Sequence, residues 1–214
     1  MKPNWAEENL QTIRTLMERS ALYRRALAPI MIFVGGAGVA GGLVGWRLQI
    51  ESICGFLFLW IGAAFLSLTG ALFLIRRQAL KDAEPFWSPP MRRVAQALMP
   101  AFFIGLTLGV IALVSSFHSA ADEYDDMVPK ILTLIWTWCY GCAIHAAGFF
   151  MPRGVRWLGW VFIVIGISML LGTILTAGRF LQVSPHFLMG GIFGGLHLAY
   201  GIYLYFTEKK NPAA

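Results

Sequence analysis

The sequence predicts an all-α fold: a polytopic membrane protein built as a bundle of six transmembrane helices, with both termini in the cytoplasm. Three observations support this fold class. The chain is 57% hydrophobic and 13% charged, whereas soluble domains are about 45–50% apolar and about 25% charged. Six apolar stretches are long enough to cross a hydrocarbon core of about 30 Å. The lysines and arginines gather between alternate stretches, as they do in membrane proteins with short loops.

The N-terminal segment, residues 1–26, is predicted to be an amphipathic helix on the cytoplasmic side. Asn4 can cap this helix, and apolar residues recur at helical spacing at Trp5, Leu10, Ile13 and Met17. Such a helix either lies in the membrane interface as an anchor or binds a partner. The residues expected to meet the membrane surface or the partner are Trp5, Arg14, Arg19, Arg24 and Arg25.

The six spans follow, and together they form one transmembrane domain over residues 27–206. We place them at residues 27–46, 53–75, 94–117, 129–150, 157–177 and 186–206. The connection between the second and third spans contains three prolines, which forbid a continuous helix there. Residues 207–214 are expected to form a short cytoplasmic tail.

Orientation follows from the lysines and arginines, because short loops rich in these residues resist translocation. Fourteen of the 17 lie in the N-terminal segment, the second and fourth connections and the tail, and the other three are Arg47, Lys130 and Arg179. We therefore expect a multi-pass protein of the bacterial cytoplasmic (inner) membrane. The net charge of +6 then reflects topology and contact with anionic lipid headgroups, and nucleic acid is not expected as a partner.

Glycines cluster in the first and last spans at a spacing of four residues. Gly38 with Gly42, and Gly191 with Gly195, would flatten one face of each helix so that another backbone can approach closely. Such faces serve close packing within the bundle, a homo-oligomer interface, or a groove for a flat ligand such as a porphyrin.

The fourth span contains W-T-W-C-Y-G-C-A-I-H-A-A-G at residues 136–148, which places Cys139, Cys142 and His145 three residues apart. The helical rise separates the first of these from the last by about 9 Å. One metal ion with ligand bonds of about 2.0–2.3 Å therefore cannot be held by all three. Buried cysteines otherwise behave as small apolar residues. We expect core packing here and predict no metal site. No catalytic residue is predicted either, because the standard hydrolase and nucleotide-binding motifs are absent.

His145 and His197 are a different case, because an ionisable side chain inside a membrane span is by default a candidate functional group. They lie in the fourth and sixth spans, about 6 Å apart in depth, and could bind a cofactor, with haem as the first candidate. His118 and His186 form a second candidate pair at the outer boundary. The alternative is that these imidazoles are neutral and hydrogen-bonded to neighbouring hydroxyl or carbonyl groups.

Two stretches of the sequence also resemble each other, as an internal repeat would predict. The stretch L-M-P-A-F-F-I-G-L at 98–106 matches L-M-G-G-I-F-G-G-L at 188–196 in five of nine positions. Two halves of three spans each would be inverted relative to one another. Many transporters build a binding site at the membrane midplane from halves arranged in this way.

The junction I-R-T-L-M-E-R-S-A-L-Y-R-R-A-L-A-P at 13–29 resembles that of a set of uncharacterised bacterial six-helix inner-membrane proteins. In these proteins a charged amphipathic helix precedes the first span. The resemblance implies a winged-helix regulator as a partner and brings no catalytic residues. The leading hypothesis is a non-catalytic accessory, structural or sensory subunit of a membrane complex. A haem-binding membrane redox protein and a small-solute transporter with 3+3 inverted repeats are the alternatives.

Overall fold

The computed structural model describes the backbone of residues 5–83, 85–118, 122–176 and 183–210, and the side chains of these ranges except 5–25, 122–126 and 208–210. Every regular element in these ranges is a helix. The helices are α1 (Trp5–Arg47), α2 (Ile53–Lys81), α3 (Pro89–Ser116), α4 (Asp122–Ala147), α5 (Arg153–Leu175), α6 (Pro185–Met189), the π-helical segment η2 (Gly190–Gly195) and α7 (Leu196–Lys210).

Six helical segments are long and apolar enough to cross a membrane, which confirms the six predicted apolar helices. They are Ala26–Arg47, Ile53–Lys81, Pro89–Ser116, Met127–Ala147, Arg153–Leu175 and Pro185–Thr207. The last of these comprises α6, η2 and most of α7. Phenylalanine, leucine and tryptophan side chains are exposed along these helices, as expected where lipid rather than water is the solvent.

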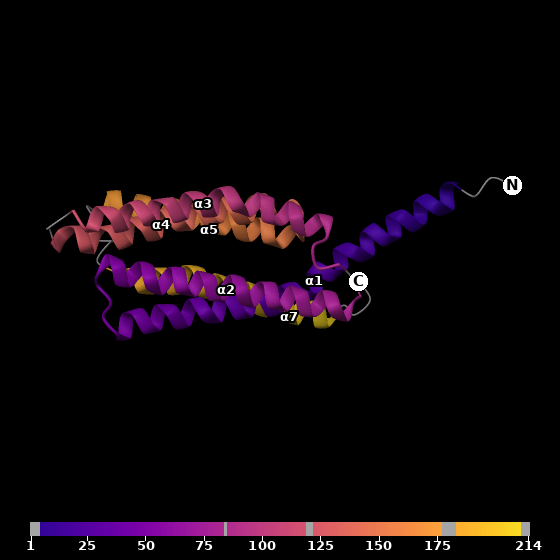
Figure 1. The fold of residues 1–214 in the computed structure, drawn as a ribbon, viewed down its shortest axis with the longest axis horizontal. Helices are drawn as coiled ribbons and strands as arrows, with labels where there is room; N and C mark the ends of the chain where they lie inside the picture. The colour runs from indigo at the N-terminus through magenta and orange to yellow at the C-terminus, as the bar shows by residue number, and fades with distance from the viewer. Residues whose placement is uncertain (1–4, 84, 119–121, 177–182, 211–214) are drawn as a thin grey trace.

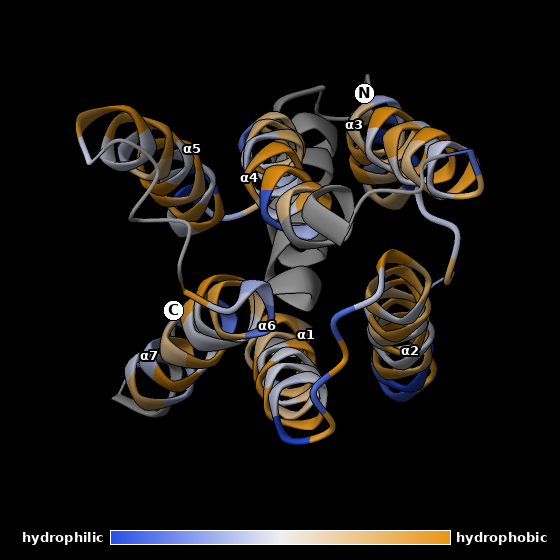
Figure 2. Ribbon diagram, turned by 90° about the vertical axis from the view of Figure 1, so that its left-hand side faces the viewer, coloured by the Kyte–Doolittle hydropathy of each residue, from blue (hydrophilic) through white to orange (hydrophobic). Residues whose placement is uncertain are grey.

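The helices are arranged in two layers (Figures 1 and 2). In one layer α1 lies between α2 and the continuous segment of α6, η2 and α7. In the other layer α4 lies between α3 and α5. The start of α1, the end of α7 and the α2–α3 and α4–α5 connections lie at the same end of the bundle (Figure 1). We call this the basic end, because the helix ends that these connections join carry Arg76, Arg77, Lys81, Arg92, Arg93, Arg153 and Arg156.

The pairing of helices repeats after three spans. The contact of α1 with α2 corresponds to that of α4 with α5, and the contact of α1 with α7 corresponds to that of α4 with α3. The two buried apolar clusters follow the same relation. One draws mainly on α1, α5 and the α6–η2–α7 segment and includes Phe162 and Leu204. The other draws mainly on α2, α3 and α4, with Met189 of α6, and includes Phe56 and Ala112. This pattern fits two three-span halves of opposite direction.

Helix α1 is a single helix of 43 residues, so the boundary expected at residue 26 lies inside it. Its length of about 65 Å is roughly twice the thickness of a hydrocarbon core. Its first residues lie far beyond the ends of the other helices (Figure 1). The residues expected to meet a membrane surface or a partner, namely Trp5, Arg14, Arg19, Arg24 and Arg25, lie outside the described side chains.

The end of α1 is closed by a motif that positions the next loop. Gln49 has a φ of 53°, and the amides of Gln49 and Ile50 donate to the carbonyls of Trp46 and Gly45 at 3.2 and 3.1 Å. This is the bonding pattern of a Schellman C-cap with a left-handed residue. The Ser52 hydroxyl then accepts from the amide of Gly55 at 3.2 Å and caps the start of α2.

Candidate functional site

A hydrogen bond between His197 and Tyr140 joins the two layers. His197 on α7 is 1% exposed, and its Nε2 lies 2.6 Å from the hydroxyl of Tyr140 on α4. Its Nδ1 lies 2.6 Å from the carbonyl oxygen of Phe193. A carbonyl oxygen can only accept, so Nδ1 carries a proton, and in the neutral ring Nε2 accepts from the Tyr140 hydroxyl. Both ring nitrogens therefore have protein partners.

Aromatic rings surround this bond on several sides. The centroid of the Tyr140 ring lies 6.1 Å from that of Phe102 on α3, 5.0 Å from that of Phe162 on α5 and 5.2 Å from that of Phe193 on η2. The ring of Phe162 also lies 5.5 Å from that of His197. The pair is thus held by residues from both layers, and water is largely excluded from it.

A second buried histidine, His186 on α6, lies near the other end of the bundle. Its Nε2 lies 2.8 Å from the carbonyl oxygen of Ile50, which the α1 C-cap positions. Its Nδ1 lies 3.2 Å from Nε1 of Trp60 on α2. Because the indole can only donate, Nδ1 accepts and Nε2 carries the proton, the tautomer opposite to that of a neutral His197. His118, expected as the partner of His186, is instead exposed and bonds the carbonyl of Val114.

The structure places His145 and His197 against different neighbours. His145 is half-buried between α4 and α5, with Nδ1 3.4 Å from the carbonyl oxygen of Arg156 and its ring edge-on to that of Trp160. No described interaction joins the two imidazoles. Ligation of haem iron through Nε2 of His197 would require the Tyr140 hydroxyl to be displaced. The geometry therefore favours the alternative of hydrogen-bonded imidazoles in the protein interior.

The three cysteines are free thiols, and two of them, Cys139 and Cys142, lie on the same helix as His145. Cys54 and Cys139 are half-buried and Cys142 is exposed. Among the residues that the structure describes, no three histidine, cysteine or acidic side chains are close enough to hold a metal ion. The acidic run at 122–126 lies outside the described side chains.

Glycines bring α1 directly against η2, but the glycines involved differ in part from those expected. A Cβ atom on Gly38 would stand 2.7 Å from Cα of Gly194, and one on Gly42 would stand 2.8 Å from Cα of Gly190. A Cβ on Gly191 or Gly195, the two glycines expected to pack in this span, would meet nothing within 4 Å. The segment G-G-I-F-G-G contains both four-residue pairs, so spacing alone cannot decide which pair faces α1. The π-helical geometry of η2 further changes the direction of successive side chains.

Tyr140 and Trp60 are the partners that sequence reasoning missed. A usable signal was present, because tyrosine and tryptophan in an apolar span carry one polar atom that seeks a partner when buried. The chain matches no family model, no curated protein and no solved structure. Function is therefore inferred from the geometry of this chain.

Proposed function

We propose that the protein is a non-catalytic subunit of a membrane complex, accessory or sensory, that presents the N-terminal part of α1 to a protein partner. The observation that supports this most is the length of α1, which runs unbroken for 43 residues. A hydrocarbon core of about 30 Å accommodates only about 20 of them. An anchor lying along the membrane surface would need a break where the chain turns into the span. Pro29 lies inside α1. A proline kinks a helix, but such a kink is smaller than the turn from the membrane surface into a span.

The position of α1 in the bundle suits a sensory role. It is the central helix of its layer and contacts α2, α6, η2 and α7. At Gly38 and Gly42 its backbone lies against that of η2, so a shift of α1 cannot be absorbed by side chains there. The next link is Phe193 of η2, whose ring contacts Tyr140 and whose carbonyl accepts from His197. A shift of α1 caused by binding at its projecting part would in this way be transmitted through η2 to α4 in the second layer.

The basic end is assigned to the cytoplasm of a bacterium, and the protein to its cytoplasmic membrane. The support is the clustering of arginine and lysine in the connections at that end, because such loops are retained on the cytoplasmic side. The partner is then a cytoplasmic protein or the cytoplasmic part of a membrane protein.

Truncation of residues 1–25 tests the proposal. The intact and truncated proteins are purified in mild detergent from the native membrane, and proteins that co-purify are quantified by mass spectrometry. A companion protein in constant ratio to the intact chain should be lost on truncation. The bundle should keep its melting temperature, because the first residues of α1 lie beyond the ends of the other helices (Figure 1). Retention of the companion by the truncated chain would contradict partner binding by residues 1–25, which we call the arm.

Two full-length variants test the apolar stripe, which we define as Trp5, Leu10, Ile13 and Met17, without shortening the helix. One variant carries Leu10→Gln, Ile13→Gln and Met17→Gln. The control carries Thr12→Gln and Thr15→Gln, on the opposite face of the helix. The first should lose the companion and the second should keep it. Equal retention by both would contradict docking through the stripe.

A small-solute transporter is the second candidate, favoured by the repetition of helix pairings after three spans. Transporters with inverted halves work by rocking one unit against the other. Spin labels at Leu80 and Trp157 at the basic end, and at Leu48 and Leu175 at the other, report the separation of the layers. Opposite changes of the two distances would support transport. A single fixed distance at each end, under all solutes tried, would contradict it.

A further inference from the structure

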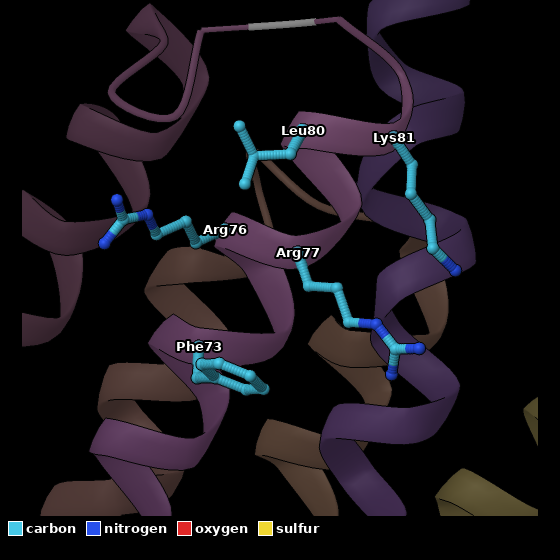
Figure 3. A pocket seen from close by; sticks show the side chains of 5 residues that line it. All are labelled: Phe73, Arg76, Arg77, Leu80 and Lys81. Atoms are coloured by element: carbon cyan, nitrogen blue, oxygen red, sulfur yellow. The ribbon is translucent and has the colours of Figure 1, made fainter.

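An open depression lies on α2 at the basic end, and the side chains that line it are Phe73, Arg76, Arg77, Leu80 and Lys81 (Figure 3). Their spacing at i, i+3, i+4, i+7 and i+8 places all five on one half of the helix surface, with Arg76 and Lys81 at its two edges. All five side chains are exposed, and the two apolar ones, Phe73 and Leu80, are 64% and 74% exposed. The depression therefore combines three cations with uncovered apolar surface.

The position of these residues along α2 determines their depth in a membrane. The helix begins at Ile53, and about 20 residues cross a hydrocarbon core, which brings Phe73 to its edge. Arg76 and Arg77 follow about 5–6 Å further along the helix. The headgroup layer of one leaflet is about 5–8 Å thick, so both guanidinium groups reach the depth of the phosphates. Lys81 lies beyond them, and its long side chain can turn back toward the same layer.

We propose that this depression binds the headgroup of an anionic phospholipid. Arg77 and Lys81 extend to the same side of α2, toward α1, whereas Arg76 extends to the other side (Figure 3). A phosphodiester between Arg77 and Lys81 receives a bidentate guanidinium contact and an ammonium contact, while an acyl chain runs down along Phe73. Clusters of lysine and arginine at the end of a membrane helix bind anionic headgroups through contacts of this kind. The inference goes beyond the partner-binding role and requires only that α2 crosses a membrane.

Native mass spectrometry of the detergent-purified full-length protein tests the site, with phosphatidylglycerol, phosphatidylcholine and inorganic phosphate as separate probes. The test variant is Arg77→Gln with Lys81→Gln. The matched control is Arg92→Gln with Arg93→Gln, which removes the same charge from exposed positions at the same end. The test variant should lose about tenfold or more in affinity for phosphatidylglycerol, and the control should lose little.

Three results would overturn the proposal. Equal losses in the two variants would show a general effect of positive charge. Equal binding of phosphatidylcholine would show that the anionic headgroup is not recognised. Displacement of the lipid by inorganic phosphate at similar concentration would assign a free-phosphate site instead. Equal melting temperatures of the variants establish that both are folded.

Discussion

Replacing Tyr140 with phenylalanine removes one hydroxyl group and leaves the aromatic packing between the layers in place. That hydroxyl lies 2.6 Å from Nε2 of His197, which would keep a buried lone pair without a partner. An unsatisfied buried acceptor costs about 1–3 kcal/mol. Hydrogen bonds between membrane helices measure lower, at about 0.6 kcal/mol on average and about 1.7 kcal/mol at most, because the unfolded chain finds partners in the membrane too. The burial of this site puts the expected loss near the upper membrane value, at about 1–2 kcal/mol.

Reversible unfolding in mixed micelles, followed by tryptophan fluorescence, measures this loss as a change in the free energy of unfolding. The control is Tyr203→Phe, since Tyr203 is on the same helix as His197 but is 61% exposed and should change stability by less than about 0.5 kcal/mol. A double-mutant cycle of Tyr140→Phe with His197→Leu should give a coupling energy of about 1 kcal/mol. Additive effects, or equal effects of the two tyrosine substitutions, would refute the hydrogen bond as a link between the layers.

The same unfolding assay checks three further predictions. Gly38→Ala should cost about 1–3 kcal/mol, because the new Cβ would stand 2.7 Å from a facing backbone atom, whereas Gly36→Ala, with nothing within 4 Å, should be neutral or slightly stabilising. Trp60→Phe removes the donor 3.2 Å from a buried histidine nitrogen and should cost about 1 kcal/mol, whereas Trp157→Phe at a 70% exposed position should cost little. Gln49→Gly should stabilise by about 0.5–1 kcal/mol, because glycine adopts the φ of 53° found there without strain. Equal effects within either pair, or a destabilising Gln49→Gly, would contradict the corresponding contact.

Hydropathy and length were sufficient to predict the helices, but their ends follow other rules. The second span was expected to end at residue 75, yet α2 continues to Lys81. Charged residues after residue 75 end the stretch that is compatible with lipid. They do not end the helix, because arginine, glutamine and lysine are good helix formers. The third span was expected to start at residue 94, yet α3 starts at Pro89, because proline is tolerated in the first turn of a helix.

The interior of the bundle was less predictable, because it depends on how each helix is rotated about its axis. The histidines could be named from the sequence, but not the fact that Tyr140 faces His197 while His145 faces the carbonyl of Arg156. The same limit applies to the glycines of η2, where two overlapping pairs share one spacing and only one pair meets α1. A π-helical turn changes the rotation of all residues that follow it, and no simple spacing rule predicts it.

Site-specific photocrosslinking along the projecting part of α1 tests the central proposal most directly. A photoreactive phenylalanine analogue is placed at Ile13 on the apolar stripe, and at Thr15 on the opposite face as the control. If the arm docks a partner, irradiation of intact cells should give one adduct of constant mass at Ile13 and none at Thr15. Crosslinks only to lipid, only to a second copy of the chain, or equally at both positions would contradict a partner-binding arm.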